Sequence, residues 1–144
     1  MKTLLYSLLV LAVVTSAPCA FGQKTVTTTH KDAHGNSVGT SQQKGNMTVN
    51  KDRHGNTIGY EENRNDRTTY RDSHGNTTGS AVQQKNITIY KDQNGNAIGS
   101  ATRQGNEVIY KDAHGNATGR DVVNGNTIVH KDKHGNTTGT SIKK

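Results

Sequence analysis

The sequence predicts an all-β fold in which six consecutive β-hairpins of 20 residues close into a shallow, radially symmetric antiparallel barrel. Three observations predict it: an aspartate recurs at a constant spacing of 20 residues, turn-forming residues follow each aspartate, and β-branched or aromatic residues precede most of them. A fixed period of this length indicates tandem supersecondary units. The repeat runs from residue 23 to residue 144, so we expect a single domain there. The copies are centred on Asp32, Asp52, Asp72, Asp92, Asp112 and Asp132.

The turn of each hairpin is predicted by the motif [YHN]-[KR]-D-x-[HN]-G-N-x-x-G, which occurs six times without insertions. The first glycine suits a left-handed position after a type I turn, and the aspartate side chain can cap the turn amides. Together these residues predict a three-residue loop with a glycine bulge. The first glycines are Gly35, Gly55, Gly75, Gly95, Gly115 and Gly135, and the second glycines are Gly39, Gly59, Gly79, Gly99, Gly119 and Gly139.

The fourth copy illustrates the expected strand register. If the aspartate faces the asparagine that follows the turn, Tyr90 lies opposite Ile98 and Ile89 lies opposite Gly99. Alternate residues of a strand point to opposite faces. We therefore expect an inner face with Ile87, Ile89, Ala97, Gly99 and Ala101, and an outer face with Thr88, Tyr90, Ile98 and Ser100. Few of the equivalent residues in other copies are large and apolar, so the expected core is thin.

A β-solenoid is the alternative architecture for a repeat of two short strands. Stacking one copy per rung would place the Lys or Arg of every copy in one column with a spacing of about 4.8 Å. Like charges directly opposite each other are destabilising. In a closed meander the equivalent residues are two strands apart, and closure removes free sheet edges. The closed barrel is therefore favoured.

The first 22 residues predict a cleaved signal peptide. They contain Lys2, an apolar run of 11 residues from Leu4 to Val14, and small or turn-prone residues up to Gly22. A membrane-spanning helix needs roughly 20 apolar residues. Cleavage after Gly22 would leave a secreted or periplasmic chain without a transmembrane segment. Cys19 follows Pro18, where a lipidation signal requires a small residue, so no lipid anchor is expected.

The repeat resembles that of the exported bacterial beta-flower proteins, whose motif is Tyr-Arg-Asp-x-x-Gly-x-x-x-Gly. The resemblance covers the whole chain after the signal peptide and is clearest from Tyr70 to Gly79 and from Tyr90 to Gly99. It implies a shallow barrel whose hairpins splay like petals, in a family without an established biochemical activity. The five-fold members of that family have one copy fewer than the six found in this chain.

Histidine recurs at one turn position and raises the question of a metal site. Imidazole is a common metal ligand, but in a ring these turns lie at separate hairpin tips, and a structural role in the turn is favoured. A calcium loop in the segment 92–96, which resembles the start of an EF-hand loop, lacks the acidic residue that would complete it. No cofactor is expected. The five turn histidines are His34, His54, His74, His114 and His134.

Catalysis is not expected, because the aspartates and histidines recur with the repeat whereas an active site requires a singular constellation in a pocket. A deep pocket holding acidic residues outside the repeat pattern would change this view. Those residues are Glu61, Glu62, Asp66, Glu107 and Asp121.

A repeated surface for binding is the favoured hypothesis for function. Removal of Lys2 leaves 17 Lys and Arg against 11 Asp and Glu, a net charge of +6, and a basic exported protein tends to meet anionic surfaces. Weak contacts made by several copies would add through multivalency to an anionic glycan, lipopolysaccharide or another envelope surface. Nucleic acid is not expected as a partner; self-assembly into a fibre or surface layer is the alternative. The candidate binding residues are Tyr70, Tyr90, Tyr110, His30 and His130.

Overall fold

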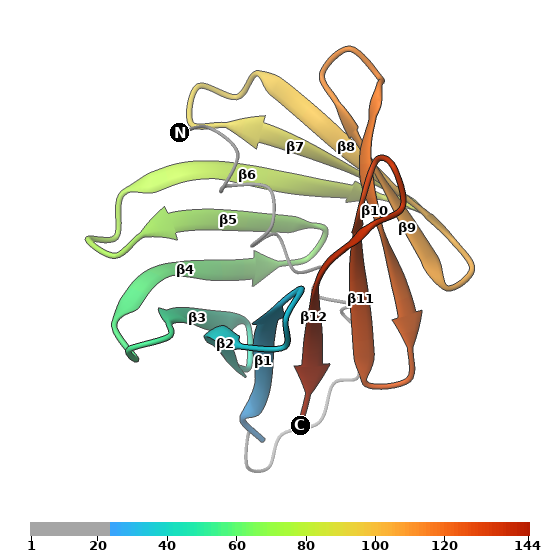
Figure 1. The fold of residues 1–144 in the computed structure, drawn as a ribbon. Helices are drawn as coiled ribbons and strands as arrows, with labels where there is room; N and C mark the ends of the chain where they lie inside the picture. Colours follow the sequence, from blue (N-terminus) through green and yellow to red (C-terminus); the bar gives the residue numbers. More distant parts are fainter. Residues whose placement is uncertain (1–23) are drawn as a thin grey trace.

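The computed structural model describes residues 24–144, which form twelve antiparallel β-strands (Figure 1). Each repeat supplies two strands, joined by the Asp motif, and a second turn leads to the next repeat. The expected signal peptide and its cleavage after Gly22 lie outside the described residues. The strands are β1 Val26–Asp32, β2 Ser37–Lys44, β3 Met47–Asp52, β4 Thr57–Arg64, β5 Arg67–Asp72, β6 Thr77–Gln84, β7 Ile87–Asp92, β8 Ala97–Gln104, β9 Glu107–Asp112, β10 Ala117–Asn124, β11 Thr127–Asp132 and β12 Thr137–Lys143.

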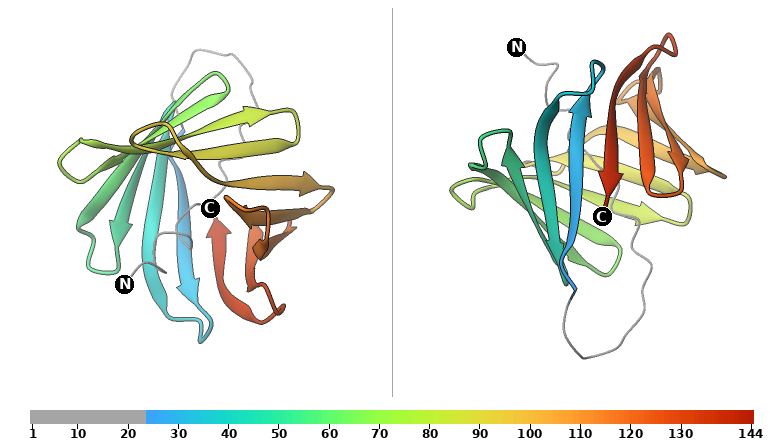
Figure 2. Two further views of the ribbon diagram at one scale, coloured as in Figure 1. Left: turned by 90° about the horizontal axis from the view of Figure 1, so that it is seen from above. Right: turned by 60° about the horizontal axis from the view of Figure 1, so that its bottom comes forward.

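The sheet is a closed meander, which confirms the predicted fold class and six hairpins rather than five. Every strand pairs with its neighbours in sequence, and β1 pairs with β12 to complete the barrel. The two strands lie side by side in both views of Figure 2. Strand direction turns steadily around the sheet, so β4 to β7 run nearly horizontally in Figure 1 while β10 to β12 run nearly vertically. No solenoid stacking occurs in residues 24–144.

The Asp motif forms the same turn in all six copies. In the fourth, the Gly95 amide donates to the Asp92 carbonyl (3.1 Å) and the Asp92 amide to the Asn96 carbonyl (3.0 Å). The Asp92 carboxylate accepts the amides of Asn94 and Asn96, both at 2.9 Å, and also the Asn96 side-chain amide. Gly95 has a φ of +88°, where a side chain would be strained. The carboxylate therefore fills the role of a cap for its own loop.

A β-bulge just beyond the turn overturns the expected register. Lys91 lies opposite Ala97, but Tyr90 lies opposite Gly99, because Ile98 is the extra residue of the bulge. The predicted pairing of Tyr90 with Ile98 was wrong, since an inserted residue shifts every later side chain to the other face. The same irregularity recurs in the five other hairpins.

The bulge also changes which residues face the interior. Gly99 and Ala101 are buried as predicted, but Tyr90 shares their face. Ile87 is 40% exposed, and Ile98 of the predicted outer face is 39% exposed. The assignment of Ile87, Ile89 and Ala97 to the inner face was therefore wrong, because strand alternation places them opposite to Tyr90.

The second glycine of each motif lies where neighbouring hairpins approach most closely. A Cβ atom at Gly99 would lie 2.6 Å from the carbonyl oxygen of Lys111 in the next hairpin. The equivalent glycines face the carbonyl of the equivalent Lys or Arg, and Gly139 faces that of Lys31 across the closure. Glycine therefore permits the spacing of hairpins around the whole barrel.

Few of the buried side chains are apolar, and most are polar or charged. Among residues 24–144, three apolar residues are buried (Ala81, Ala101 and Val108), against eight that are polar or charged. Buried polar groups require hydrogen-bond partners.

Residues 24–144 contain no helix that is long and apolar enough to cross a membrane.

Two-residue loops join the repeats, and their first residue has a positive φ. Glycine holds this position in three loops, at Gly45, Gly105 and Gly125, whereas Asn65 (φ 54°) and Lys85 (φ 56°) hold it in the other two. A residue with a side chain rarely adopts this conformation, although asparagine tolerates it better than most. Lys85 is therefore a point of backbone strain.

Replacing Gly99 with alanine should lower the free energy of unfolding by about 1–3 kcal/mol, the usual range for overpacking. The new methyl group would collide with the backbone carbonyl of Lys111, which belongs to the sheet and moves only with it. Urea unfolding measures the change. Ser100→Ala is the control on the neighbouring, outward position, with an expected change within about 0.5 kcal/mol. Equal losses in both variants would contradict the assigned close approach.

Replacing Lys85 with glycine should raise the free energy of unfolding by about 0.5–1 kcal/mol. The left-handed conformation costs a residue with a side chain roughly 1–2 kcal/mol, and the greater freedom of glycine in the unfolded chain offsets part of the gain. Thermal and urea unfolding measure the change. Lys85→Ala removes the same charge but keeps Cβ, so stabilisation by alanine equal to that by glycine would exclude backbone strain as the cause.

Candidate functional site

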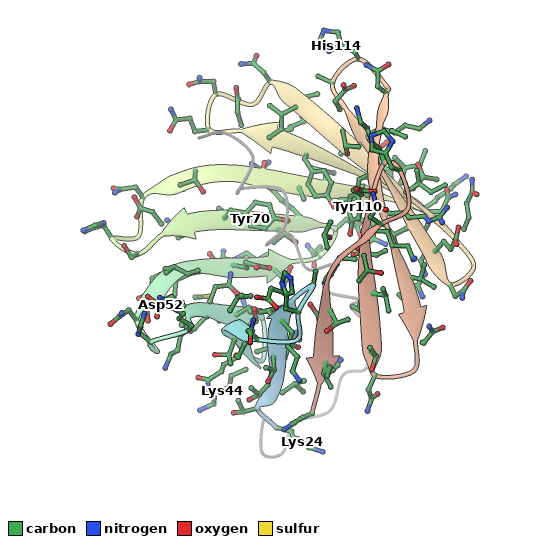
Figure 3. All side chains as sticks on the ribbon, viewed as in Figure 1. Lys24, Lys44, Asp52, Tyr70, Tyr110 and His114 are labelled. Carbon is green, nitrogen blue, oxygen red and sulfur yellow. The ribbon has the colours of Figure 1, made fainter. Side chains whose placement is uncertain are left out.

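Twelve side chains, one from each strand, form a ring inside the barrel. The residue two positions before each Asp lies directly opposite a residue of the adjoining hairpin, for example His30 opposite Ser141 and Glu61 opposite Tyr70. Figure 3 shows Tyr70 and Tyr110 in the middle of the molecule, whereas Asp52 and His114 lie at its periphery. From β1 to β12 the ring consists of His30, Ser41, Asn50, Glu61, Tyr70, Ala81, Tyr90, Ala101, Tyr110, Asp121, His130 and Ser141.

Hydrogen bonds connect the first four members of the ring. His30 Nε2 lies 2.8 Å from Ser41 Oγ, and His30 Nδ1 lies 2.9 Å from Ser141 Oγ across the closure. Ser41 Oγ donates to Asn50 Oδ1 (2.6 Å), and Asn50 Nδ2 donates to Glu61 Oε1 (2.8 Å). All five residues are buried. The chain of bonds therefore spans four consecutive strands and the closing pair.

The same chain continues in the other direction from Ser141. His130 Nε2 lies 2.7 Å from Ser141 Oγ, and His130 Nδ1 lies 2.7 Å from Asp121 Oδ1. Tyr110 donates its hydroxyl to Asp121 Oδ2 at 2.7 Å. Asp121 is 4% exposed and has both oxygens in hydrogen bonds. We call His30, Ser41, Asn50, Glu61, Asp121, His130 and Ser141 the polar side of the ring.

The hydrogen-bonded chain from Glu61 to Tyr110 needs more protons than His30 and His130 carry when both are neutral. One of the two histidines must therefore carry a second proton. Ser41 gives its only proton to Asn50, so His30 Nε2 must donate to Ser41. With His30 neutral, its Nδ1 accepts the Ser141 proton, and His130 Nε2 must then donate to Ser141. Since Asp121 accepts from His130 Nδ1, both nitrogens of His130 carry protons.

Burial decides which histidine holds the extra proton. It lowers the pKa of His30, and the charge of His130 lowers that pKa further, so His30 stays neutral. His130 instead faces the carboxylate of Asp121 at ion-pair distance. The Asp121–His130 pair is therefore neutral as a unit, and no net charge remains on that part of the ring.

Glu61 is the second carboxylate of the ring, and it lacks such a partner. It is 6% exposed, and burial raises its pKa, while the hydrogen bond from Asn50 acts in the opposite direction. Asn50 occupies Oε1, and no hydrogen bond from residues 24–144 reaches Oε2. Glu61 therefore has one unpaired carboxylate oxygen in the ring, and this oxygen is not fully buried.

The remaining ring members differ in character, and we call Tyr70, Ala81, Tyr90, Ala101 and Tyr110 the tyrosine side of the ring. The three tyrosines keep part of their surface exposed, whereas most of the polar side is buried. Burial raises the pKa of each tyrosine, and the charges of Asp121 and Glu61 raise that of Tyr90 further. Both carboxylates therefore act on the Tyr90 hydroxyl. The solvent-accessible part of the ring is mainly aromatic.

The structure brings together the residues predicted as a binding face, but on the inside. Tyr70, Tyr90, Tyr110, His30 and His130 all belong to the ring, so they converge on one interior instead of forming a patch on each repeat. The expectation that this face is outward was wrong, because the bulge places Gly99 and Ala101 on the tyrosine face. The Lys and Arg of the motif alternate with these residues and therefore point outward.

The turn histidines stay apart. Each lies at the tip of its own hairpin, as His114 does in Figure 3, and its amide donates to the Asp of the same turn. Across residues 24–144 no group of three His, Cys, Asp or Glu side chains could hold a metal ion. At the segment considered for calcium, the Asp92 carboxylate is turned back onto its own loop.

Sequence reasoning did not assign Ser41, Asn50, Glu61, Asp121 and Ser141 to a site. A signal was present, because the position nine residues after each Asp holds a carboxylate in two copies and a small residue in the other four: Ser41, Glu61, Ala81, Ala101, Asp121 and Ser141. Of the acidic residues outside the repeat pattern, Glu61 and Asp121 lie in the ring. Glu62 instead forms an exterior ion pair with Arg64 (2.6 Å), and Asp66 is exposed.

The sequence matches no protein-family model, and no curated protein matches it significantly.

Nitrogen-detected NMR of the imidazoles should show two different protonation states near neutral pH. His30 is expected as the neutral tautomer with its proton on Nε2, and His130 with protons on both nitrogens, because this arrangement makes every bond of the chain while burial lowers the pKa of His30. A proton on Nδ1 of His30 in the unaltered protein would contradict the assigned direction of the chain.

Proposed function

We propose that this chain is an exported, non-enzymatic binding protein that uses the tyrosine side of the ring as its contact surface. One observation carries the proposal: three partly exposed tyrosines, separated by alanines, line a ring whose other members are mostly buried and bonded to one another. Aromatic side chains provide a large apolar contact area together with a hydroxyl group. An interior ring offers one contact surface for each molecule.

This proposal replaces the multivalent surface by a single site. The tyrosines converge on one interior, and Glu61 contributes negative charge there, so an anionic glycan or lipopolysaccharide is disfavoured as the ligand of the ring. Such anions would meet the basic exterior of the barrel. A small neutral or cationic ligand of the extracellular space suits the ring better.

A ligand screen with two tyrosine variants tests the proposal. The exported protein is screened by thermal shift against neutral saccharides, amines and short acyl lipids, and hits are measured by titration calorimetry. Tyr90→Ala should weaken binding by about 10-fold or more, as expected from losing one aromatic contact. Tyr60→Ala is the matched control, because Tyr60 lies on the outer face of β4 opposite Val49 and Arg71.

Two outcomes would contradict the proposal. In the first, hits bind Tyr90→Ala and Tyr60→Ala with equal affinity while both variants remain folded by circular dichroism. In the second, light scattering shows particle size growing with concentration, which would support self-assembly. Closure leaves no free strand edge among residues 24–144, so assembly would use faces such as that of the exposed Val38, Ile58 and Ile98.

A further inference from the structure

Glu61 is the charge in the ring that no other ring member compensates. The Asp121 carboxylate is paired with His130 and Tyr110, and His30 is neutral. Glu61 is 6% exposed and receives one hydrogen bond from a neutral amide. Its Oε2 accepts no hydrogen bond from residues 24–144 and is not among the fully buried unpaired atoms there, so it retains some contact with solvent. A carboxylate that is largely removed from water gains from a cationic partner. The ring therefore contains a place for one positive charge.

The neighbours of Glu61 define what kind of cation suits this place. Glu61 lies directly opposite Tyr70, and Ala81, the next member, lies opposite Tyr90. Tyr70 and Tyr90 are thus two strands apart, a separation of about 9.6 Å at the usual strand spacing. This separation is less than twice the roughly 6 Å reach of a cation–π contact, so one cation between the two tyrosines can contact both.

We propose that the tyrosine side of the ring binds an organic cation of the alkylammonium class, with its ammonium group between Tyr70 and Tyr90 and its charge facing Glu61. This inference rests on the proposed function and names its ligand class. Aromatic faces with a nearby carboxylate suit an alkylated ammonium group, which offers charge and apolar surface but few hydrogen-bond donors. Ala81 places only a methyl group between the two tyrosines.

Other occupants match these residues less well. A bare metal ion needs several oxygen or nitrogen ligands, and residues 24–144 contain no group of three His, Cys, Asp or Glu that could supply them. A neutral saccharide could stack on the tyrosines but would leave the Glu61 charge unpaired. An anion would be repelled by it. The alkylammonium group is the occupant that satisfies both the aromatic faces and the charge.

Choline and its neutral isostere, in which a tert-butyl group replaces the trimethylammonium group, separate charge from shape. Titration calorimetry of the exported protein near neutral pH should show saturable choline binding, with the isostere weaker by about 10-fold or more. Glu61→Gln should reduce choline affinity by about 10-fold or more while keeping the hydrogen bond from Asn50. Glu62→Gln is the matched control one residue away on the outer face and should leave the affinity unchanged.

Acidification should weaken choline binding, because protonation removes the charge of Glu61. Burial raises the pKa of this carboxyl, so the loss should begin at a higher pH than for an exposed glutamate. The other titratable groups of the ring are Asp121, His30, His130 and the three tyrosines, and they remain in place in Glu61→Gln. The pH dependence of the residual binding in that variant should therefore be much flatter.

The outcomes separate this inference from the proposed function. Choline that binds no better than its isostere, or binds Glu61→Gln as well as the unaltered protein, overturns the alkylammonium assignment. So does the absence of choline binding up to about 10 mM, a concentration at which even a weak complex would be seen. A saccharide or lipid that binds through Tyr90 in the same samples would leave the proposed function standing. Circular dichroism confirms that each variant is folded.

Discussion

The β-bulge beyond each Asp turn decides which residues of this protein face one another. A hairpin without the extra residue would place the second glycine opposite the isoleucine, valine or threonine that precedes the tyrosine position. With it, the glycine lies opposite the tyrosine position itself. The interior ring, the close approach of hairpins at the glycines and the exposure of Ile98 all follow from that single inserted residue. Because the bulge occurs in every hairpin, its effect extends around the barrel.

The sequence was informative where the chemistry is local. The 20-residue period, the capped turn and the closed meander follow from Asp, Gly and Asn at fixed offsets, and from the repulsion that stacking would impose on Lys or Arg columns. The face assignment was wrong because a bulge at Ile98 has little local signature: the residue is β-branched and suits a regular strand equally well. The ring chemistry was missed for the same reason, since Glu61 and Asp121 acquire partners only after the strands are placed.

Within each hairpin the Asp, Gly and Asn of the turn are the same in every copy, whereas the inward-facing residues vary. The turn residues that hold the backbone recur in all six copies, whereas the inward positions range from alanine to tyrosine, serine, histidine and two carboxylates. Much of the described interior is polar, so the barrel depends on hydrogen-bonded ladders and turns more than on apolar burial. This division allows one backbone to carry an asymmetric interior. The hydrogen bond between His130 and Asp121 and the unpaired oxygen of Glu61 belong to that asymmetry.

The barrel closes only when its first and last strands pair, and these strands are far apart in the sequence. The bonds within a hairpin join residues about ten apart, as His30 and Ser41 are 11 apart, whereas His30 and Ser141 are 111 apart. The backbone groups of Thr27 and Lys144 complete the same seam. Five of the six hairpins can therefore form and pair while two strand edges stay open, and an open edge is a template for another chain. Strand β12 therefore closes the barrel. A chain that is truncated before β12 would keep two unpaired strand edges, and these edges could pair with other chains that are folding nearby.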